Sequence, residues 1–318
     1  MRVAVIGAGG IGGLYGGLLA RAGHEVSFLA RGPHLRAIQA HGLQVQSAQF
    51  GTFTVRGRAS DAARDLGEAD LVLFAVKTYD LESAASAAVH LLAPAGVLLT
   101  FQNGVDAPDR VAALIGSEHV LIGTTGLETT ILEPGVIGHL SAAHYVYVGA
   151  LHGPPDARVR GVVEVLSDAG INASEVEDGH RALWEKAFVL IPMATLTSVC
   201  QAPIGPIREL PETNALIDAL FDEVTAVAAA YGYDLSAARP RVRGIIDGWA
   251  FDGKASMARD FERGRPTELE AVTGALVRMA DARGIDVPVA RTAYALLRLR
   301  EHLASSAENP LGTAPAGR

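Results

Sequence analysis

Val3-Ala4-Val5-Ile6, followed at once by Gly7-Ala8-Gly9-Gly10-Ile11-Gly12, is the stretch that decides the fold. The apolar run predicts a short strand, and a helical pattern continues from the glycines to about Ala22. In G-x-G-x-x-G the first glycine permits a tight turn, the second lets the backbone approach a pyrophosphate, and the third lets helix and strand pack closely. The helix N-terminus adds unpaired N–H groups and positive potential. A dinucleotide site is therefore predicted, the alternative being a glycine-rich turn that binds nothing.

The end of the next predicted strand, Glu25–Leu29, selects the cofactor. An NAD-preferring site expects a carboxylate about 20 residues past the loop, where it holds the ribose 2′-OH. This chain continues Ala30-Arg31-Gly32 instead. A guanidinium there can bind a 2′-phosphate through two hydrogen bonds and stack on adenine. Arg31 therefore favours NADP (NADPH) over NAD, unless it is an ordinary solvated charge at a strand end.

Length and composition limit the class of protein. A chain of 318 residues suggests two domains, and 49% hydrophobic residues allow a sizeable core. A net charge of -8 argues against nucleic acid as a partner. The single cysteine, Cys200, excludes an intrachain disulfide and fits the cytoplasm. The apolar segment Ala187–Cys200 stops short of the roughly 18 residues of a membrane span, so no membrane partner is expected.

The first half of the chain alternates strand and helix patterns, which predicts a parallel sheet with helices on both faces. Strands are expected at Leu43–Ser47, Thr52–Arg56, Leu71–Val76 and Val97–Phe101, and helices at Gly32–His41 and Tyr79–Leu92. Residues 120–149 suggest hairpin-like β structure capping that sheet. A helix at Pro155–Ala169 and a strand at Ile171–Ser174 complete the domain.

From Gly179 onward only helical patterns remain. Helices are expected at Arg181–Cys200, Glu212–Tyr231, Leu235–Asp247, Thr267–Arg283 and Pro288–Ser305. The fold class is therefore α/β, with an N-terminal Rossmann-type doubly wound sheet and a C-terminal all-helical domain. The predicted domains are 1–177, which binds NADP, and 178–305, which is helical and carries substrate and catalysis. Residues 306–318 are expected to be a disordered tail.

Four places carry candidate chemistry. Asn103, in Gln102-Asn103-Gly104, follows a strand end, where doubly wound sheets bind ligands, although Asn-Gly is also a plain turn. Lys77 also follows a strand and could anchor a phosphate, or be a solvated lysine. Lys186, on the most apolar helix, would have its pKa lowered by burial and could act as a general acid; the alternative is a snorkelling lysine. Ser256 and Glu268 could equally be helix-start residues, Glu268 in a first turn.

The order and spacing of several short strings resemble the ketopantoate reductase family (2-dehydropantoate 2-reductase and relatives), over roughly residues 1–305. The strings are GAGGIG, Ala30-Arg31-Gly32, VKTYD at Val76–Asp80, QNG at Gln102–Gly104, GTT at Gly123–Thr125, Trp184-x-Lys186, SM-x-x-D at Ser256–Asp260, and Thr267-Glu268. The resemblance implies a Rossmann domain and a helical domain, with NADPH and a 2-oxo acid in the cleft between them. The family reaction converts ketopantoate to pantoate in pantothenate biosynthesis.

The same resemblance implies residue roles. Lys186 would donate a proton to the ketone oxygen, and Glu268 would organise lysine, substrate and cofactor. Ser256 would hold the substrate carboxylate, and Asn103 would lie against nicotinamide and substrate. The cofactor would be bound by Gly7, Ala8, Gly9, Gly10, Ile11 and Gly12, by Arg31, Lys77 and Asn103, by the backbone around Thr129, and by Glu268. No metal site is expected.

The chain departs from the family pattern at four substrate-facing asparagines. Their positions hold Leu190, Ala194, Ile204 and Gly253. Because each lost polar contact in a desolvated site costs on the order of 1–3 kcal/mol, little affinity for ketopantoate would remain. A bulkier or less hydroxylated 2-oxo acid, or a plain ketone, would fit better.

Two other functions remain open at this point. A β-hydroxyacid or 6-phosphogluconate-type dehydrogenase also pairs a Rossmann domain with a helical one, but Leu190 disfavours it. A non-catalytic NADP-binding sensor would explain the altered pocket, but needs neither Lys186 nor Glu268. A homodimer is possible.

Overall fold

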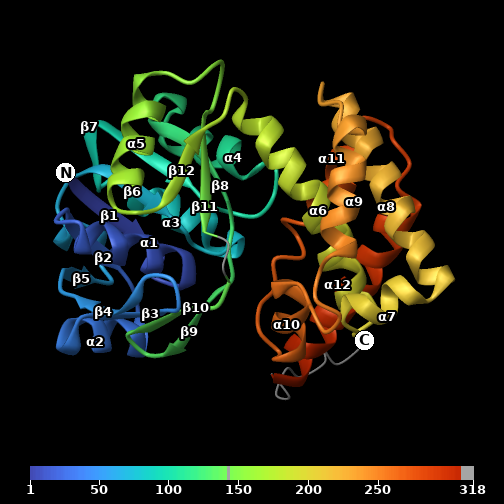
Figure 1. Ribbon diagram of the computed structural model, residues 1–318, viewed down its shortest axis with the longest axis horizontal. Coiled ribbons are helices and arrows are strands. Elements are labelled where there is room, and N and C mark those ends of the chain that lie inside the picture. The colour runs from blue at the N-terminus through green and yellow to red at the C-terminus, as the bar shows by residue number, and fades with distance from the viewer. Residues whose placement is uncertain (142–143, 309–318) are drawn as a thin grey trace, which may run out of the picture. The chain divides into compact units, whose positions relative to one another are not determined.

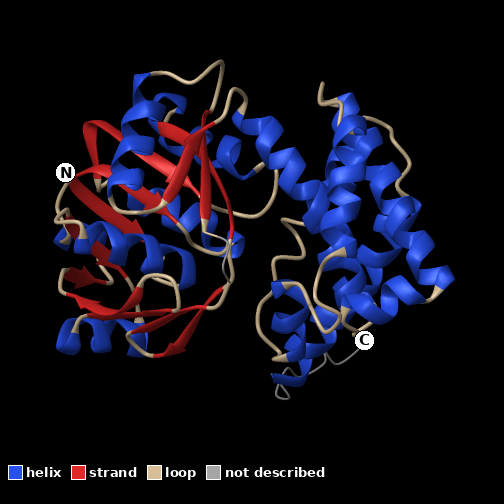
Figure 2. Ribbon diagram, viewed as in Figure 1, coloured by secondary structure: helices blue, strands red, loops and turns tan. Residues whose placement is uncertain are grey.

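The computed structural model describes residues 1–141 and 144–308 and forms two compact units, Met1–Leu183 and Trp184–Arg318. The division falls inside helix α6 (Gly179–Val199), a few residues past the predicted domain boundary at 177 and 178. Of the expected tail, residues 306–308 continue the last helix, and residues 309–318 lie outside the described residues. Figure 2 shows strands in the first unit and helices in both.

The first unit is built on an eight-stranded sheet in the order β12-β11-β8-β7-β6-β1-β2-β5 (Figure 1). Its strands are β1 (Arg2–Ile6), β2 (Glu25–Leu29), β5 (Arg58–Ser60), β6 (Ala69–Phe74), β7 (Leu92–Thr100), β8 (Val120–Gly126), β11 (Tyr145–Ala150) and β12 (Asn172–Glu175). All neighbours pair in parallel except β8 and β11. The predicted Rossmann-type sheet is confirmed.

The strand order reverses at β1. The chain goes from β1 to β2 on one side and later returns to β6 on the other. In open parallel sheets, ligands bind in the crevice outside the carboxyl ends of the strands at such a reversal. The loops that follow β1 and β6 therefore lie where a ligand of this fold is held.

Five α-helices accompany this sheet: α1 (Gly10–Arg21), α2 (Gly32–His41), α3 (Leu81–Ala88), α4 (Ala107–Ile115) and α5 (Ala157–Asp168), with short 3₁₀ turns η1 (Ala63–Asp65), η2 (Thr78–Asp80) and η3 (Ser117–His119). Helix α2 has the predicted bounds, whereas α4 was not predicted. The Asp156 side chain caps α5 by accepting the N–H groups of Arg158 and Val159. Helix α1 packs so closely on β1 that a Cβ at Gly16 would lie 2.6 Å from Val5.

A second, four-stranded sheet corrects the sequence analysis. It has the order β4-β3-β10-β9, formed by β3 (Leu43–Ser47), β4 (Gly51–Val55), β9 (Thr129–Glu133) and β10 (Val136–His139). The two segments near residues 43–56 were wrongly assigned to the parallel sheet. Only three residues, 48–50, separate β3 from β4, which begins with Gly51 at φ 74°. A link this short allows only antiparallel pairing of the two strands, because parallel strands need a crossover of about a dozen residues. Residues 120–149 do not merely cap the main sheet, since β8 and β11 belong to it.

The second unit is helical throughout its described residues, as predicted. Beyond α6 it contains α7 (Ile204–Glu209), α8 (Pro211–Ala230), η4 (Ser236–Ala238), α9 (Arg239–Asp247), α10 (Ser256–Glu262), α11 (Thr273–Asp281) and α12 (Pro288–Glu308). Helices α7 and α10 were not predicted. The helix expected from Thr267 begins only at Thr273, because Val272, at φ −100° and ψ −86°, departs from helical geometry. Glu268 therefore lies in the preceding turn, not in a first helical turn.

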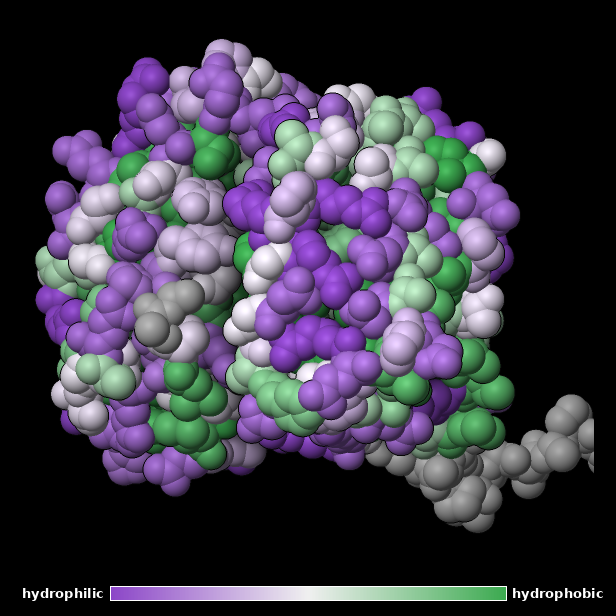
Figure 3. All heavy atoms as spheres, turned by 45° about the vertical axis from the view of Figure 1, so that its right-hand side comes forward, coloured by the Kyte–Doolittle hydropathy of each residue, from purple (hydrophilic) through white to green (hydrophobic). Residues whose placement is uncertain are grey.

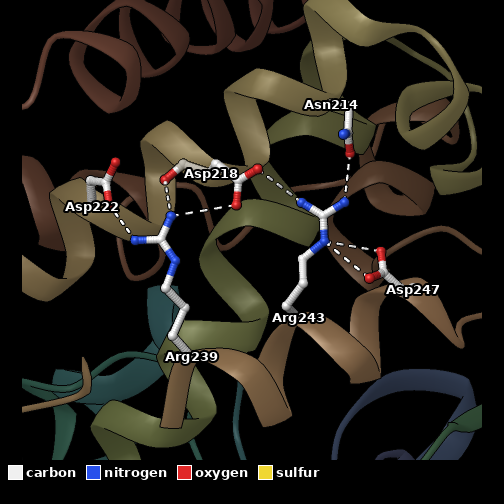
Figure 4. Close-up of polar contacts among 6 residues, drawn as sticks. All are labelled: Asn214, Asp218, Asp222, Arg239, Arg243 and Asp247. Atoms are coloured by element: carbon white, nitrogen blue, oxygen red, sulfur yellow. Dashed lines mark hydrogen bonds and ion pairs between the residues drawn. The ribbon is translucent and has the colours of Figure 1, made fainter. Parts of the chain in front are cut away.

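Charged side chains join α8 to α9 (Figure 4). Arg243 donates to Asp218 and Asn214 on α8 and to Asp247 on its own helix, at 2.7–3.1 Å. Arg239 pairs with Asp218 and Asp222. Asp218 thus serves both arginines, and such networks fix geometry better than isolated exposed pairs. They hold α9, and with it the start of the segment that leads to Ser256.

By length and mean hydropathy, α6 meets the criterion for a membrane span, which the sequence analysis had not expected. However, 67% of the relevant window is buried inside the protein. Phe188 of this helix packs against Phe221 of α8 with ring centroids 4.8 Å apart. On the face drawn in Figure 3, hydrophilic residues predominate and hydrophobic ones form separate groups. Helix α6 is therefore accounted for as the core helix of the second unit.

Candidate active site

Of the three motif glycines in the loop after β1, the first and third are crowded and the second is open. Gly7 has φ 91°, and a Cβ there would lie 2.8 Å from backbone atoms of Ala75 and Val76. A Cβ on Gly12 would lie 2.3 Å from the Gly7 carbonyl oxygen. At Gly9, by contrast, no other heavy atom of the described residues outside its chain neighbours comes within 4 Å of the Cβ position. The first and third glycines are required for packing, while the second leaves backbone open to a ligand.

Helix α1 begins at this open position. Gly9 is its N-cap and, within the described chain, no side chain caps it. The first N–H groups of a helix have no partner inside the helix and favour an anion. A Cβ at Gly10 would lie 2.4 Å from Oγ1 of Thr129, so the start of β9 lies against the loop, as the resemblance implied. The geometry fits the pyrophosphate of a dinucleotide.

His34 of α2 holds the loop from one side, and the sequence analysis missed it. Its Nδ1 accepts the N–H of Gly135 at 3.0 Å, so Nε2 carries the proton and donates to the Ala8 carbonyl at 2.8 Å. Burial lowers the pKa of His34, which favours this neutral imidazole, while the bond to Ala8 opposes the shift. No local pattern around His34 signals this contact, because its partners come from two distant segments.

Arg31 and Lys77 follow the ends of β2 and β6, which flank β1. Arg31 is the N-cap of α2 and its exposed side chain pairs with Asp80 of η2. Lys77 is the N-cap of η2 and is half-buried. Both residues thus lie at the sheet edge where the glycine loop begins, as predicted.

The loop after β7 is tied to the loop after β6. Gln102 donates from Nε2 to the carbonyls of Phe74 at 2.8 Å and Val76 at 3.1 Å. Its Oε1 is buried without a hydrogen-bond partner among the described residues. The adjacent Asn103 is half-buried, and Gly104 takes φ 105°. Gln102 therefore fixes the turn that presents Asn103.

Lys186 and Glu268 of the second unit influence each other electrostatically. Lys186 is half-buried on α6, and Glu268 is buried in the turn before α11. Burial lowers the pKa of Lys186 to about 8, and the negative charge of Glu268 works in the opposite direction. A lysine in this state exchanges a proton near neutral pH, which an ordinary lysine does not. Ser256 is the exposed first residue of α10.

The four positions that depart from the family pattern lie in the second unit with this pair. Leu190, one helical turn past Lys186, is half-buried, whereas Ala194 and Ile204 are fully buried. The N–H of Ile204 donates to the carbonyl of Gly253 at 2.9 Å, so two of the positions touch.

Trp249 covers the fourth of these positions, Gly253. A Cβ at Gly253 would lie 2.4 Å from Cδ1 and 2.8 Å from Nε1 of the indole. The ring therefore occupies the place of a side chain at 253, and it remains 38% exposed. Sequence reasoning missed Trp249, because only the turn 249–253 brings it onto the glycine. Among the described residues, no group of three or more His, Cys, Asp or Glu side chains could hold a metal ion.

Fold and site together define a two-domain, pyridine-nucleotide-dependent oxidoreductase. Residues 3–153 match the family described as Ketopantoate reductase PanE/ApbA, and residues 178–301 match its C-terminal counterpart, Ketopantoate reductase PanE/ApbA C terminal. The chain is 33% identical to the 2-dehydropantoate 2-reductase of Archaeoglobus fulgidus, over 93% of this chain and 97% of that one. The chain belongs to the ketopantoate reductase family and is an oxidoreductase.

Solved structures agree with this assignment. A PanE/ApbA family ketopantoate reductase from Ralstonia eutropha JMP134 is 32% identical and superimposes with a TM-score of 0.89, covering 96% of this chain and 100% of that one. D-mandelate dehydrogenase, solved with NADH and anilino(oxo)acetate, shares the fold with a TM-score of 0.87 at 21% identity, covering 96% and 100%. Family membership decides against the β-hydroxyacid or 6-phosphogluconate-type alternative.

Proposed function

We propose that this enzyme uses NADPH to reduce a 2-oxo acid with an apolar side group to the corresponding 2-hydroxy acid. When bound, the nicotinamide would supply the hydride for the carbonyl carbon, and Lys186 would supply the proton for the carbonyl oxygen. The observation that carries the proposal is the placement of Lys186 on the apolar helix α6, under the charge of the buried Glu268 carboxylate, in surroundings that lower the lysine pKa to about 8. An acid with a pKa near the working pH transfers its proton most effectively. Lys186 is restored by a proton from solvent.

Glu268 has a positioning and electrostatic role in this scheme. Its buried carboxylate raises the pKa of Lys186 against the effect of burial, which keeps the ammonium populated at neutral pH. Without that charge the lysine would lose its proton at a lower pH. Glu268 would also help to hold cofactor and substrate, as the family resemblance implies.

The cofactor role is supported by the first unit. The open backbone at Gly9 and the N-terminus of α1 suit the pyrophosphate, and the crowded Gly7 and Gly12 explain the motif. Arg31 stands where an NAD-preferring site would carry an acid, and it would bind the 2′-phosphate. Lys77 would add positive charge, and Asn103 would contact the nicotinamide carboxamide.

The substrate class follows from the second unit. Ser256 would bind the carboxylate of the 2-oxo acid. Beyond that carboxylate the substrate would meet the half-buried Leu190 and the indole of Trp249, which offer apolar surface and one indole N–H. Away from that N–H, a hydroxyl brought there would lose hydration without gaining a partner, at a cost of about 1–3 kcal/mol. A branched or aromatic side group would be favoured instead.

Steady-state oxidation of NADPH tests this proposal. The panel would contain ketopantoate, 4-methyl-2-oxopentanoate, phenylpyruvate and acetophenone, which lacks the carboxylate. We expect kcat/KM to be at least about tenfold higher for the apolar 2-oxo acids than for ketopantoate or the ketone. Efficient turnover of ketopantoate above all others would refute the substrate assignment. Turnover that survives in Lys186→Ala would refute the catalytic one, and absence of turnover with every substrate would favour the sensor function.

The cell compartment and the oligomeric state of the enzyme stay predictions. Cys200 is an exposed free thiol, which suits the reducing cytoplasm. The sequence analysis leaves a homodimer open, and the mass of the protein in solution tests it.

A further inference from the structure

An ion pair crosses the sheet edge at which the cofactor is proposed to bind. Arg31 follows β2, and Asp80 ends η2, which follows β6. Because β1 lies between β2 and β6, the pair joins the two loops on either side of the glycine loop. The guanidinium proposed to bind the 2′-phosphate is therefore already paired with a carboxylate, that of Asp80.

The two partners differ in how firmly they are held. The Asp80 N–H donates to the Lys77 carbonyl at 2.9 Å, and the Asp80 carbonyl accepts the hydroxyl of Ser83 at 3.0 Å. The Asp80 side chain is only 27% exposed, whereas that of Arg31 is 77% exposed. Asp80 is thus fixed by its turn, and the guanidinium reaches over to it. An exposed pair of this kind is weak, so a bound phosphate can replace the carboxylate.

We propose that Asp80 sets cofactor specificity: its carboxylate competes with the adenosine 2′-phosphate for Arg31 and so restrains the preference for NADPH over NADH. The inference rests on the proposed function, since it assumes that Arg31 receives that phosphate. A guanidinium already neutralised attracts a phosphate less, and a nearby carboxylate repels it. NADH, which lacks the phosphate, does not experience this competition. The ratio of NADPH affinity to NADH affinity is therefore lower with Asp80 present than it would be if Arg31 had no carboxylate partner.

Calorimetric binding of two small ligands tests this without catalysis. The ligands are 2′,5′-ADP and 5′-AMP, which differ only by the 2′-phosphate. We expect Asp80→Asn to bind 2′,5′-ADP about 3–10-fold more tightly than the wild type at low ionic strength, with the gain shrinking as salt is added. Binding of 5′-AMP should not change. In the Arg31→Ala/Asp80→Asn double variant the gain should disappear.

Glu82→Gln is the matched control. It removes one carboxylate two positions along the chain, where Glu82 pairs with Arg110 instead. Unchanged 2′,5′-ADP affinity in this variant supports a specific effect of Asp80, and an equal gain would overturn it as mere net charge. Asp80→Asn binding no tighter than wild type also overturns the inference. If Arg31→Ala leaves 2′,5′-ADP affinity intact, the NADP proposal itself fails, a result distinct from the failure of Asp80 alone.

Discussion

The glycine loop of the first unit and the pocket residues of the second unit are built in opposite ways. Gly7, Gly9 and Gly12 act through backbone geometry and lie within six consecutive residues. The pocket positions, on α6, on α7 and in the turn before α10, depend on the side chains at or over them, namely Leu190, Ala194, Ile204 and the Trp249 ring over Gly253. The difference shows that a loop built from backbone can keep the family motif while side-chain positions around Lys186 depart from it.

The two regions differ in how tightly each residue is packed by its neighbours. A backbone loop crowded by its own carbonyls tolerates almost no added atom, so its residues are dictated locally. A half-buried side chain such as Leu190 can be exchanged at the cost of one contact, without disturbing Lys186 one turn away. The predictions below test that separation, beginning with the largest effect.

Replacement of Lys186 should produce the largest loss. Lys186→Met should lower kcat/KM by about 10²–10⁴-fold, because it removes the proton donor. NADPH affinity, measured by fluorescence titration, should stay within a factor of about two. Lys186→Arg keeps the positive charge beside Glu268 but cannot release a proton near neutral pH. An active arginine variant would show that charge, not proton transfer, is what the position provides.

Two alanine substitutions in the glycine loop should separate packing from binding. Gly12→Ala places a Cβ 2.3 Å from the Gly7 carbonyl, so the free energy of unfolding should fall by about 1–3 kcal/mol. Gly9→Ala meets open space at φ −76°, so stability should change by less than about 0.5 kcal/mol.

The same Gly9→Ala variant should nevertheless bind NADPH about tenfold or more weakly, since its methyl group occupies the approach of the pyrophosphate. Thermal unfolding and NADPH titration of both variants give the two readings. Undiminished NADPH binding by Gly9→Ala would mean that the pyrophosphate does not lie against this loop.

The pH dependence should follow the lysine. For reduction, kcat/KM should be flat below a pH of about 8 and fall about tenfold per unit above it, since the protonated form is the donor. For oxidation of the hydroxy acid the limb should reverse, because the neutral amine is then the base. Glu268→Gln removes the charge that raises the pKa, so its break should move to lower pH. If kcat/KM of this variant begins to fall at the same pH as in the wild type, Glu268 does not raise the pKa of Lys186.

The smallest effect is expected in the pocket. Leu190→Asn restores one polar group beside Lys186 and should shift the ratio of kcat/KM toward ketopantoate by about 2–10-fold, the net value of one hydrogen bond. Leu190→Met, which stays apolar, should leave the ratio unchanged. Competition between ketopantoate and 4-methyl-2-oxopentanoate measures the ratio directly. Equal shifts in both variants would indicate a steric effect, not a polar one.

Some features were predictable because they are local. The strand and glycine loop, the bounds of α2, the helical second unit and the lowered pKa of Lys186 all follow from neighbouring residues or from one helix face. Features that depend on distant segments were missed or wrong. In the second sheet β3 pairs with β10, which lies far along the chain. Glu268 was predicted in a helix but lies in a turn, because α11 begins only at Thr273.

The dinucleotide loop, the fold class and the place of Lys186 on an apolar helix could all be predicted from the sequence, because turn stereochemistry and apolar periodicity act over a few residues. Only the tertiary structure decided that His34 holds Ala8, that Trp249 covers Gly253 and that Asp80 pairs with Arg31. Each of these contacts depends on the path of the chain between its partners. A side chain's partner across such a path is set by packing and strand order, which no local pattern encodes.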